Sequence, residues 1–298
     1  MPSLKDLKDR QRSIVATKKI TSAMKMIAAA KLKKAQTQAY AARPYTELMA
    51  TMLEDLLARI QDPTQLPVSF IGRTPARSHM IILTTSNRGL SGSFNSSLVR
   101  MAETHIKKLQ AKNQDVKIYC IGRKGKEQLS RCYHPLIIQT VDALDKPRFY
   151  DASNIAKELF SLFENQEFDA CSIIYNKFIS ALEQKVTLTS LIPFKLEHDN
   201  PAQQRIDKAP QALKSPYEYE PGESEVLDQL LFRNLAVQIY HTLLENVASE
   251  QGARMSAMDT ATRNANDMLK TINLTYNRTR QAYITKELIE IISGAETL

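Results

Sequence analysis

The residues with the clearest potential for chemistry form a glycine-containing loop, SNRGLSGSFN, at 86–95. Gly89 and Gly92 follow an apolar run, and they would let backbone N–H groups approach a phosphate. The loop lacks the third glycine of a dinucleotide-binding fingerprint, and no acid follows at the usual distance. Ser91 does not stand in the GxSxG context of a nucleophilic serine. The spacing therefore favours an ordinary strand–turn–helix connection over a phosphate site.

The other candidates for chemistry are weaker. GRKGK at 122–126 lacks the GxxxxGK[ST] spacing of a P-loop, so we predict a basic turn there. No two histidines share metal-ligand spacing, and no pair of carboxylates is placed for acid–base catalysis. The three cysteines have no CxxC spacing, which predicts buried or inert thiols in a reducing compartment. We expect no active site, metal site or cofactor of the chain's own.

Both ends of the chain predict very long helices. Residues 3–43 contain neither proline nor glycine, and residues 223–298 contain no proline and only Gly252 and Gly294. A helix of ~70 residues would be roughly 100 Å long, whereas a compact domain of this chain length is only about 50 Å across. Such helices must pair with each other or project into a partner. We predict one helix from about Leu4 to Arg59, with a bend or break at Pro44, and another from about Glu223.

Apolar spacing indicates how these helices pair. In the first helix, Ile20, Ala23, Ile27 and Ala30 have the alternating three–four spacing of a coiled-coil seam. The last helix carries one apolar stripe along its length: Leu227, Leu231, Leu235, Ile239, Leu243, Val247, Met255, Met258, Ala265, Leu269, Ile272, Tyr276 and Tyr283. Its other faces are polar past Gly252, so we expect it to pair with one neighbour inside a larger cavity.

The middle of the chain alternates between strand and helix patterns. Short β-rich runs occur at 79–85, 116–122, 170–176 and 185–194, with helical patterns between them at 95–111, 125–131 and 152–165. This alternation predicts an α/β fold with a largely parallel sheet. We therefore divide the chain into an N-terminal coiled-coil helix (1–60), an α/β domain (76–195) and a C-terminal coiled-coil helix (223–298).

The positive charge is concentrated at the N-terminal end. The whole chain has a formal net charge of +8, and residues 1–34 hold ten Lys/Arg against two Asp. A solvated helix would mix the two signs, so this segment is suited to an acidic surface such as nucleic acid, a membrane or acidic protein loops. No run of 18 apolar residues occurs, and the first residues lack a signal-peptide pattern, so we predict neither membrane insertion nor a targeting peptide.

Two terminal segments resemble the gamma subunit of F-type ATP synthases: TKKITSAMKMIAAAKLKKAQ (17–36) and ITKELIEIISGAETL (284–298). The second is similar to that family's signature at Ile284, Thr285, Glu287, Glu290, Gly294 and Ala295, and departs from it at Thr297. Further similarity lies at 85–95, 121–129, 175–184, 217–221 and 249–258, so the resemblance covers essentially the whole chain.

The resemblance implies a fold and a function. The terminal helices would form an antiparallel coiled coil, the shaft, above a Rossmann-like α/β foot. The shaft would transmit torque between a proton-driven membrane ring of c subunits and a catalytic hexamer of three alpha and three beta subunits. The epsilon subunit would lie beside the foot. Because the nucleotide sites of the family lie on alpha and beta, a degenerate glycine loop is expected. The implied location is the cytoplasmic face of a bacterial inner membrane, or the matrix face in a mitochondrion.

The resemblance also implies contact residues. Those expected to meet loops of the beta subunits are Lys18, Lys19, Met24, Lys25, Arg280, Gln281, Thr285 and Glu287. An apolar collar at the top of the hexamer would surround Leu288, Ile291 and Ile292. Tyr219 and Glu220 would lie on the side of the rotor ring.

Two alternatives remain open at this point. The basic first helix could make the chain a nucleic-acid-binding coiled-coil protein, which predicts salt-sensitive duplex binding lost on neutralising Lys31, Lys33 and Lys34. An enzyme using the 86–95 loop would show saturable nucleotide binding lost with Gly89→Val. A shaft predicts no ATPase activity of the isolated chain, and loss of assembly or coupling on truncating residues 284–298.

Overall fold

A computed structural model of the chain describes residues 3–59, 72–73, 75–193 and 223–296. The chain divides into two compact units, one made of residues 1–30 and 254–298, the other of residues 31–253. Two long helices contribute to both units, α1 (Leu4–Arg59) and α7 (Glu223–Glu296). The predicted bounds of the first helix and the predicted start of the last are confirmed, and α1 continues through Pro44.

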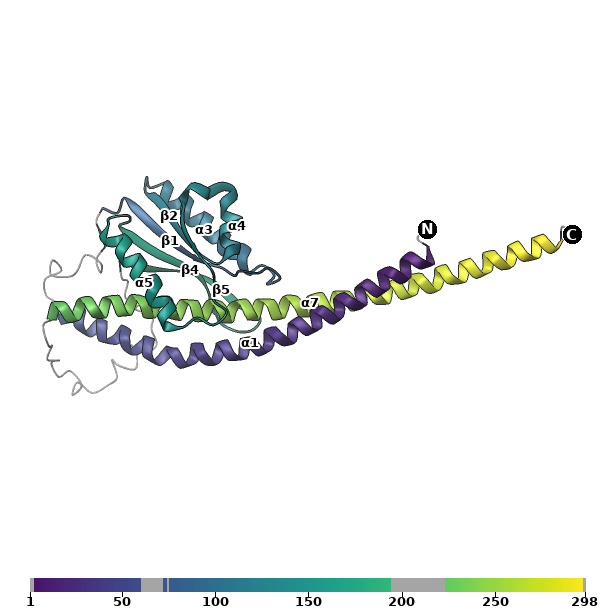
Figure 1. The fold of residues 1–298 in the computed structure, drawn as a ribbon, viewed down its shortest axis with the longest axis horizontal. Coiled ribbons are helices and arrows are strands. Elements are labelled where there is room, and N and C mark those ends of the chain that lie inside the picture. Colours follow the sequence, from purple (N-terminus) through teal and green to yellow (C-terminus); the bar gives the residue numbers. More distant parts are fainter. Residues whose placement is uncertain (1–2, 60–71, 74, 194–222, 297–298) are drawn as a thin grey trace. The chain divides into compact units, whose positions relative to one another are not determined.

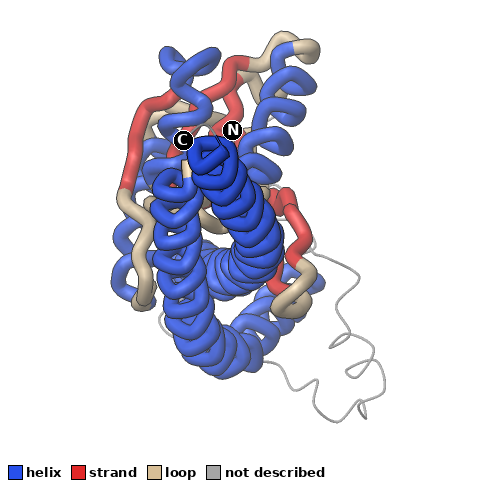
Figure 2. Tube along the Cα trace, turned by 90° about the vertical axis from the view of Figure 1, so that its right-hand side faces the viewer, coloured by secondary structure: helices blue, strands red, loops and turns tan. Residues whose placement is uncertain are grey.

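In the first unit, α1 and α7 lie side by side and antiparallel (Figure 1). Three hydrogen bonds join them: Gln11 Nε2 to Asn273 Oδ1 at 2.8 Å, Thr262 Oγ1 to Thr21 Oγ1 at 2.8 Å, and Lys25 Nζ to Asp259 Oδ1 at 2.6 Å. Residue numbers fall along α7 as they rise along α1. In this register Ser3 lies opposite residues near Gln281, so the end of α7 extends past the start of α1 (Figure 1). Figure 2 shows the helix pair from this end.

The predicted seam of α1 is wrong by one residue. Ile20 and Ile27 are 60% and 59% exposed, whereas the adjacent Thr21 and Ala28 are buried. Small side chains at the contact let the two helix backbones approach closely, and the larger isoleucines are left outside. The stripe predicted on α7 holds within this unit: Met258 and Ala265 are buried, Tyr276 is half-buried, and only Tyr283, beyond the start of α1, is exposed.

The second unit contains a five-stranded sheet in the order β3-β2-β1-β4-β5. Its strands are β1 (Ser78–Thr84), β2 (Asp115–Ile121), β3 (Ile137–Val141), β4 (Ala170–Phe178) and β5 (Gln184–Ile192). The first four strands are parallel and β5 is antiparallel to β4. The connecting helices are α3 (Phe94–Gln110), α4 (Arg123–Tyr133) and α5 (Phe149–Glu164), with a short 3-10 turn at His134–Leu136. The largely parallel sheet is as predicted, and β3 is an additional strand.

Helices cover both faces of this sheet (Figure 1). Alternate side chains of β1 point to opposite faces, as the pleat requires. Met80 and Ile82 pack with α5 and with the part of α7 that contains Ile239, whereas Ile81 and Leu83 pack with α3 and α4. The predicted combination of long terminal helices with a small α/β domain is confirmed. Among the described residues, none of the helices combines the length and the apolar character that a membrane span requires.

Candidate functional site

The carboxyl edge of the parallel strands is where α/β sheets usually bind ligands, and here side chains of the chain itself occupy it. Asn95 Oδ1 accepts a hydrogen bond from the backbone N–H of Ser86 at 3.0 Å, and Asn95 Nδ2 donates to Ser86 Oγ at 2.8 Å. Asn87 Oδ1 accepts from the backbone N–H groups of Arg123 and Ala143. The backbone N–H groups of Ser86, Arg123 and Ala143 are therefore already bonded within the protein.

Gly122, at the same carboxyl edge of the sheet, lies directly against Thr85. Its φ is +103°, and a Cβ added there would lie 2.3 Å from the carbonyl oxygen of Thr85. Thr85 Oγ1 in turn accepts the backbone N–H of Gly125 at 2.9 Å. The basic turn predicted at 122–126 is instead the start of α4, which begins at Arg123. The start of α4 is thus bonded to Asn87 and Thr85, and both of its glycines, Gly122 and Gly125, lie against Thr85.

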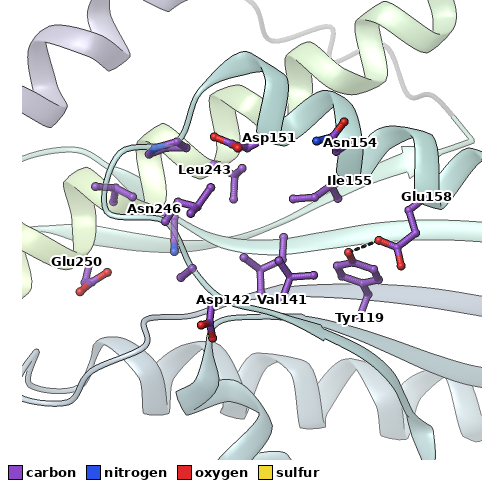
Figure 3. A pocket seen from close by; sticks show the side chains of 15 residues that line it. Tyr119, Val141, Asp142, Asp151, Asn154, Ile155, Glu158, Leu243, Asn246 and Glu250 are labelled. Atoms are coloured by element: carbon purple, nitrogen blue, oxygen red, sulfur yellow. Dashed lines mark hydrogen bonds between the residues drawn. The ribbon is translucent and has the colours of Figure 1, made fainter.

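A cavity of about 350 Å³ lies between α5, the ends of β2 and β3, and α7 (Figure 3). Glu158 accepts hydrogen bonds from Tyr119 Oη at 2.7 Å and from Gln139 Nε2 at 3.0 Å. Burial raises the pKa of Tyr119, and its hydrogen bond to Glu158 raises it further. Asp151 accepts the backbone N–H of Arg148 at 2.8 Å at the start of α5. These carboxylates have structural roles, and no metal-binding cluster of His, Cys, Asp or Glu occurs among the residues that the structure describes.

Two histidines and two cysteines are packed in the α/β domain. His79 Nε2 lies 2.9 Å from Ser172 Oγ, and its ring meets that of His105 edge-on at 5.5 Å. Burial lowers the pKa of His79 to about 4, helped by the charge of His105. Cys120 and Cys171 are buried, and burial raises the pKa of Cys120 to about 12. The prediction of buried thiols thus holds for these two, whereas Cys132 is exposed.

The predicted contact residues of α1 lie on consecutive turns within the first unit. Lys19 is exposed, and Lys18 and Met24 are half-buried. Lys25 differs because its ammonium group is bonded to Asp259 of α7, which also pairs with Arg263. The hydrogen bond from Lys25, followed by that from Arg263, lowers the pKa of Asp259. Lys25 therefore has a role inside the helix pair, and its contact with a partner subunit stays a prediction.

The predicted contact residues of α7 are all exposed. Arg280, Gln281, Thr285 and Glu287 are polar, and Leu288, Ile291 and Ile292 are 53%, 68% and 58% exposed. Tyr283, Ile284 and Ile289 add further exposed apolar surface. An isolated protein rarely presents so many neighbouring large apolar side chains to water, so this end of α7 is suited to a binding partner. Tyr219 and Glu220 lie outside the described residues.

Sequence reasoning missed a group of buried polar residues on α7, Glu245, Asn246 and Ser249. Their signal is present in the sequence: polar residues recur at three–four spacing directly beside the apolar stripe that packs on the sheet. A single sequence does not distinguish a buried row of polar residues from a solvent-exposed helix face, because both consist of polar residues.

Fold and exposed surfaces together define a protein with two long paired helices, a small α/β domain and an exposed apolar helix end. A family model described as ATP synthase matches residues 3–298. ATP synthase gamma chains from Rhizobium etli and Xanthobacter autotrophicus are 46% and 48% identical over 300 residues, covering 100% of both chains in each case. The chain belongs to the gamma chain family of ATP synthases.

Solved structures agree with this assignment. A chain from the Tetrahymena thermophila mitochondrial ATP synthase central stalk/c-ring is 26% identical, with a TM-score of 0.60 over 81% of this chain and 99% of that one. A chain of the Euglena gracilis mitochondrial ATP synthase has the same fold, at 18% identity and a TM-score of 0.67 over 99% of this chain and 94% of that one. The predicted gamma-subunit function is confirmed at the level of the family, and the nucleic-acid alternative is not supported.

Proposed function

We propose that this chain is the rotor shaft of an F-type ATP synthase. In this proposal residues 1–60 and 223–298 form the shaft and residues 76–195 form the foot. The shaft turns inside three alpha and three beta subunits, and the foot contacts the epsilon subunit and the membrane ring of c subunits. Rotation then couples proton translocation to ATP synthesis or hydrolysis, because each angle of the shaft makes different contacts with three otherwise equal beta subunits.

The exposed apolar end of α7 carries this proposal. Ile284, Leu288, Ile289, Ile291 and Ile292 are each at least 44% exposed, on a segment that has no part of α1 opposite it in the helix pair. At 100° per residue, these five side chains and Tyr283 cover about 240° of the helix circumference. A single groove covers one side of a helix, so this distribution favours a socket that surrounds it. In the proposal Leu288, Ile291 and Ile292 contact that collar.

The polar contact residues would act below the collar. Lys18, Lys19 and Met24 face acidic loops of the beta subunits in this proposal, and opposite charge at a moving contact favours some rotor angles over others. Lys25 faces the same loops in this proposal while its ammonium group stays paired with Asp259. A second set on α7 (Arg280, Gln281, Thr285 and Glu287) makes polar contacts with a beta loop. Tyr219 and Glu220 are assigned to the side of the rotor ring.

The bacterial gamma chains among the relatives support a location on the cytoplasmic face of a bacterial inner membrane. There the chain would be a peripheral component of the membrane-associated complex. The matrix face of a mitochondrion is the corresponding location if the chain is organellar.

The proposal is tested by reversing charge at Lys18 and Lys19 in the assembled synthase. Both side chains reach solvent, so the unfolding stability should change little. We expect the number of protons pumped per ATP hydrolysed by membrane vesicles to fall several-fold in the Lys18→Glu/Lys19→Glu variant. The matched control is Lys33→Glu/Lys34→Glu, which makes the same charge change at exposed positions of the same helix. Equal losses of pumping and hydrolysis, at an unchanged ratio, would count against the proposed contact.

A further inference from the structure

Strand β4 extends beyond its parallel neighbour. The pairing of β1 with β4 ends at Leu83 and Ile174, whereas β4 continues to Phe178 and pairs with β5 on its other side. Past Ile174, the edge of β4 that faced β1 would present unpaired backbone N–H and C=O groups. Such groups need partners when they are buried.

Side chains of α7 take the place of the missing strand. Asn246 Oδ1 accepts the backbone N–H of Asn176 at 3.3 Å, and Ser249 Oγ donates to the carbonyl oxygen of Asn176 at 2.9 Å. Two residues further along the same edge, Glu245 Oε2 accepts the backbone N–H of Phe178 at 2.8 Å. Glu245 and Ser249 are 0% exposed and Asn246 is 4% exposed. Three side chains of one helix therefore bond the backbone groups of Asn176 and Phe178, two residues that face the same edge of β4.

The backbone of α7 also comes close to the turn between β4 and β5. A Cβ added to Gly252 would lie 3.3 Å from the carbonyl oxygen of Ala181 and 3.4 Å from Gln184 Nε2. Glycine at this position lets the helix backbone itself lie against the turn. We call Glu245, Asn246, Ser249 and Gly252, with the β4–β5 hairpin that they contact, the hairpin joint.

The polar character of the joint has a physical consequence. Apolar packing such as that of Ile239 on the sheet is non-directional, so it resists separation more than it resists small sliding or turning. Hydrogen bonds weaken steeply when their geometry is changed. Three of them on backbone groups fix both the position of α7 along β4 and its rotation about its own axis. A buried carboxylate is costly unless it is bonded, so Glu245 also favours this one arrangement over its neighbours.

We propose that the hairpin joint is where torque passes between the α/β domain and α7. This inference rests on the proposed rotor function and names the residues that make the connection stiff. Glu245, Asn246 and Ser249 are positioning residues, because they act by holding the angle of α7 against the hairpin. Weakening the joint makes the connection compliant: the complex still hydrolyses ATP, while less of each rotation reaches the membrane ring.

The test uses the assembled synthase and a bead attached through Cys132, which is exposed on α4 of the α/β domain. Ser249→Ala removes one of the three bonds with a minimal change of volume, and Glu245→Leu removes a second. The angular variance of the bead during each pause, which rises as torsional stiffness falls, is measured together with protons pumped per ATP. We expect Ser249→Ala to raise the variance at least twofold and lower the pumping ratio, with a larger effect in the double variant. Glu245→Gln, whose amide oxygen can still accept the bond from Phe178, should remain close to the unmodified chain.

The control separates stiffness from stability. Ile106 is fully buried on the opposite face of the sheet, so Ile106→Val lowers the melting temperature without touching the joint. This control should leave the variance and the pumping ratio unchanged. The joint proposal is overturned if Ser249→Ala leaves both readings unchanged, or if the control shifts them as much at a comparable loss of stability. Absence of rotation in the unmodified complex would instead refute the proposed function itself.

Discussion

The pH dependence of stability should depend on His79. Burial lowers the pKa of this side chain to about 4, from an ordinary value of 6.5. The unfolded chain therefore binds a proton as the pH falls below 6.5, while the folded chain does so only near pH 4. Stability is fully present above pH 6.5 and is lost as the pH falls toward 4. A pKa difference of about 2.5 between the unfolded and folded chain contributes about 3 kcal/mol to the free energy of unfolding at neutral pH. About 2.5 kcal/mol of this contribution is already lost at pH 4.5.

The measurement is urea unfolding of the full chain between pH 7.5 and 4.5, followed by circular dichroism because the chain contains no tryptophan. His79→Gln is the reference variant, since glutamine can reach Ser172 and does not titrate. Subtracting the two curves removes the titration of carboxylates common to both proteins. We expect the stability of the unmodified chain to fall by about 2.5 kcal/mol more than that of the variant. Parallel curves for the two proteins would refute the reasoning.

Three further outcomes follow from the geometry. Gly122→Ala should destabilise the chain by at least about 2 kcal/mol in chemical unfolding, because its Cβ would collide with a carbonyl oxygen at positive φ, whereas Gly89→Ala has open space and should change little. Lys25→Ala should raise the pKa of Asp259 in a carboxyl NMR titration, and an unchanged pKa would contradict the ion pair. Deleting residues 284–298 should leave the unfolding of the helix pair unaltered while assembly or coupling is lost; a large fall in the melting temperature would show that this end packs within the chain.

The long helices and most strands could be predicted because their signals are local. The absence of proline and glycine from residues 3–43 indicates a long first helix, which continues through Pro44 to Arg59. The β-rich runs bounded by turn residues locate four strands. Strand β3 was missed because its five residues, IIQTV, are only partly buried and follow a His-Pro pair. At the sheet edge of the second unit, a short strand does not need a strong apolar pattern.

The details of contact could not be predicted because neighbouring stripes of a helix can share one period. Ile20 and Ile27 are seven residues apart, and so are Thr21 and Ala28, so spacing alone gives both pairs equal weight. The structure buries the smaller pair. Lys25 illustrates the same limit, because its bond to Asp259 joins residues 234 positions apart. Sequence similarity indicated the family and the subunits expected to bind the chain. The group that each side chain contacts within the chain depends on long-range packing.

The most direct test of the rotor account is to observe rotation. The chain is assembled with purified alpha and beta subunits, and a bead is attached through Cys132 of the α/β domain. The account predicts that ATP drives stepwise rotation with three equivalent pauses per turn, and that the isolated chain hydrolyses no ATP. Hydrolysis equal to that of the alpha–beta mixture alone, without rotation of the bead, would contradict it.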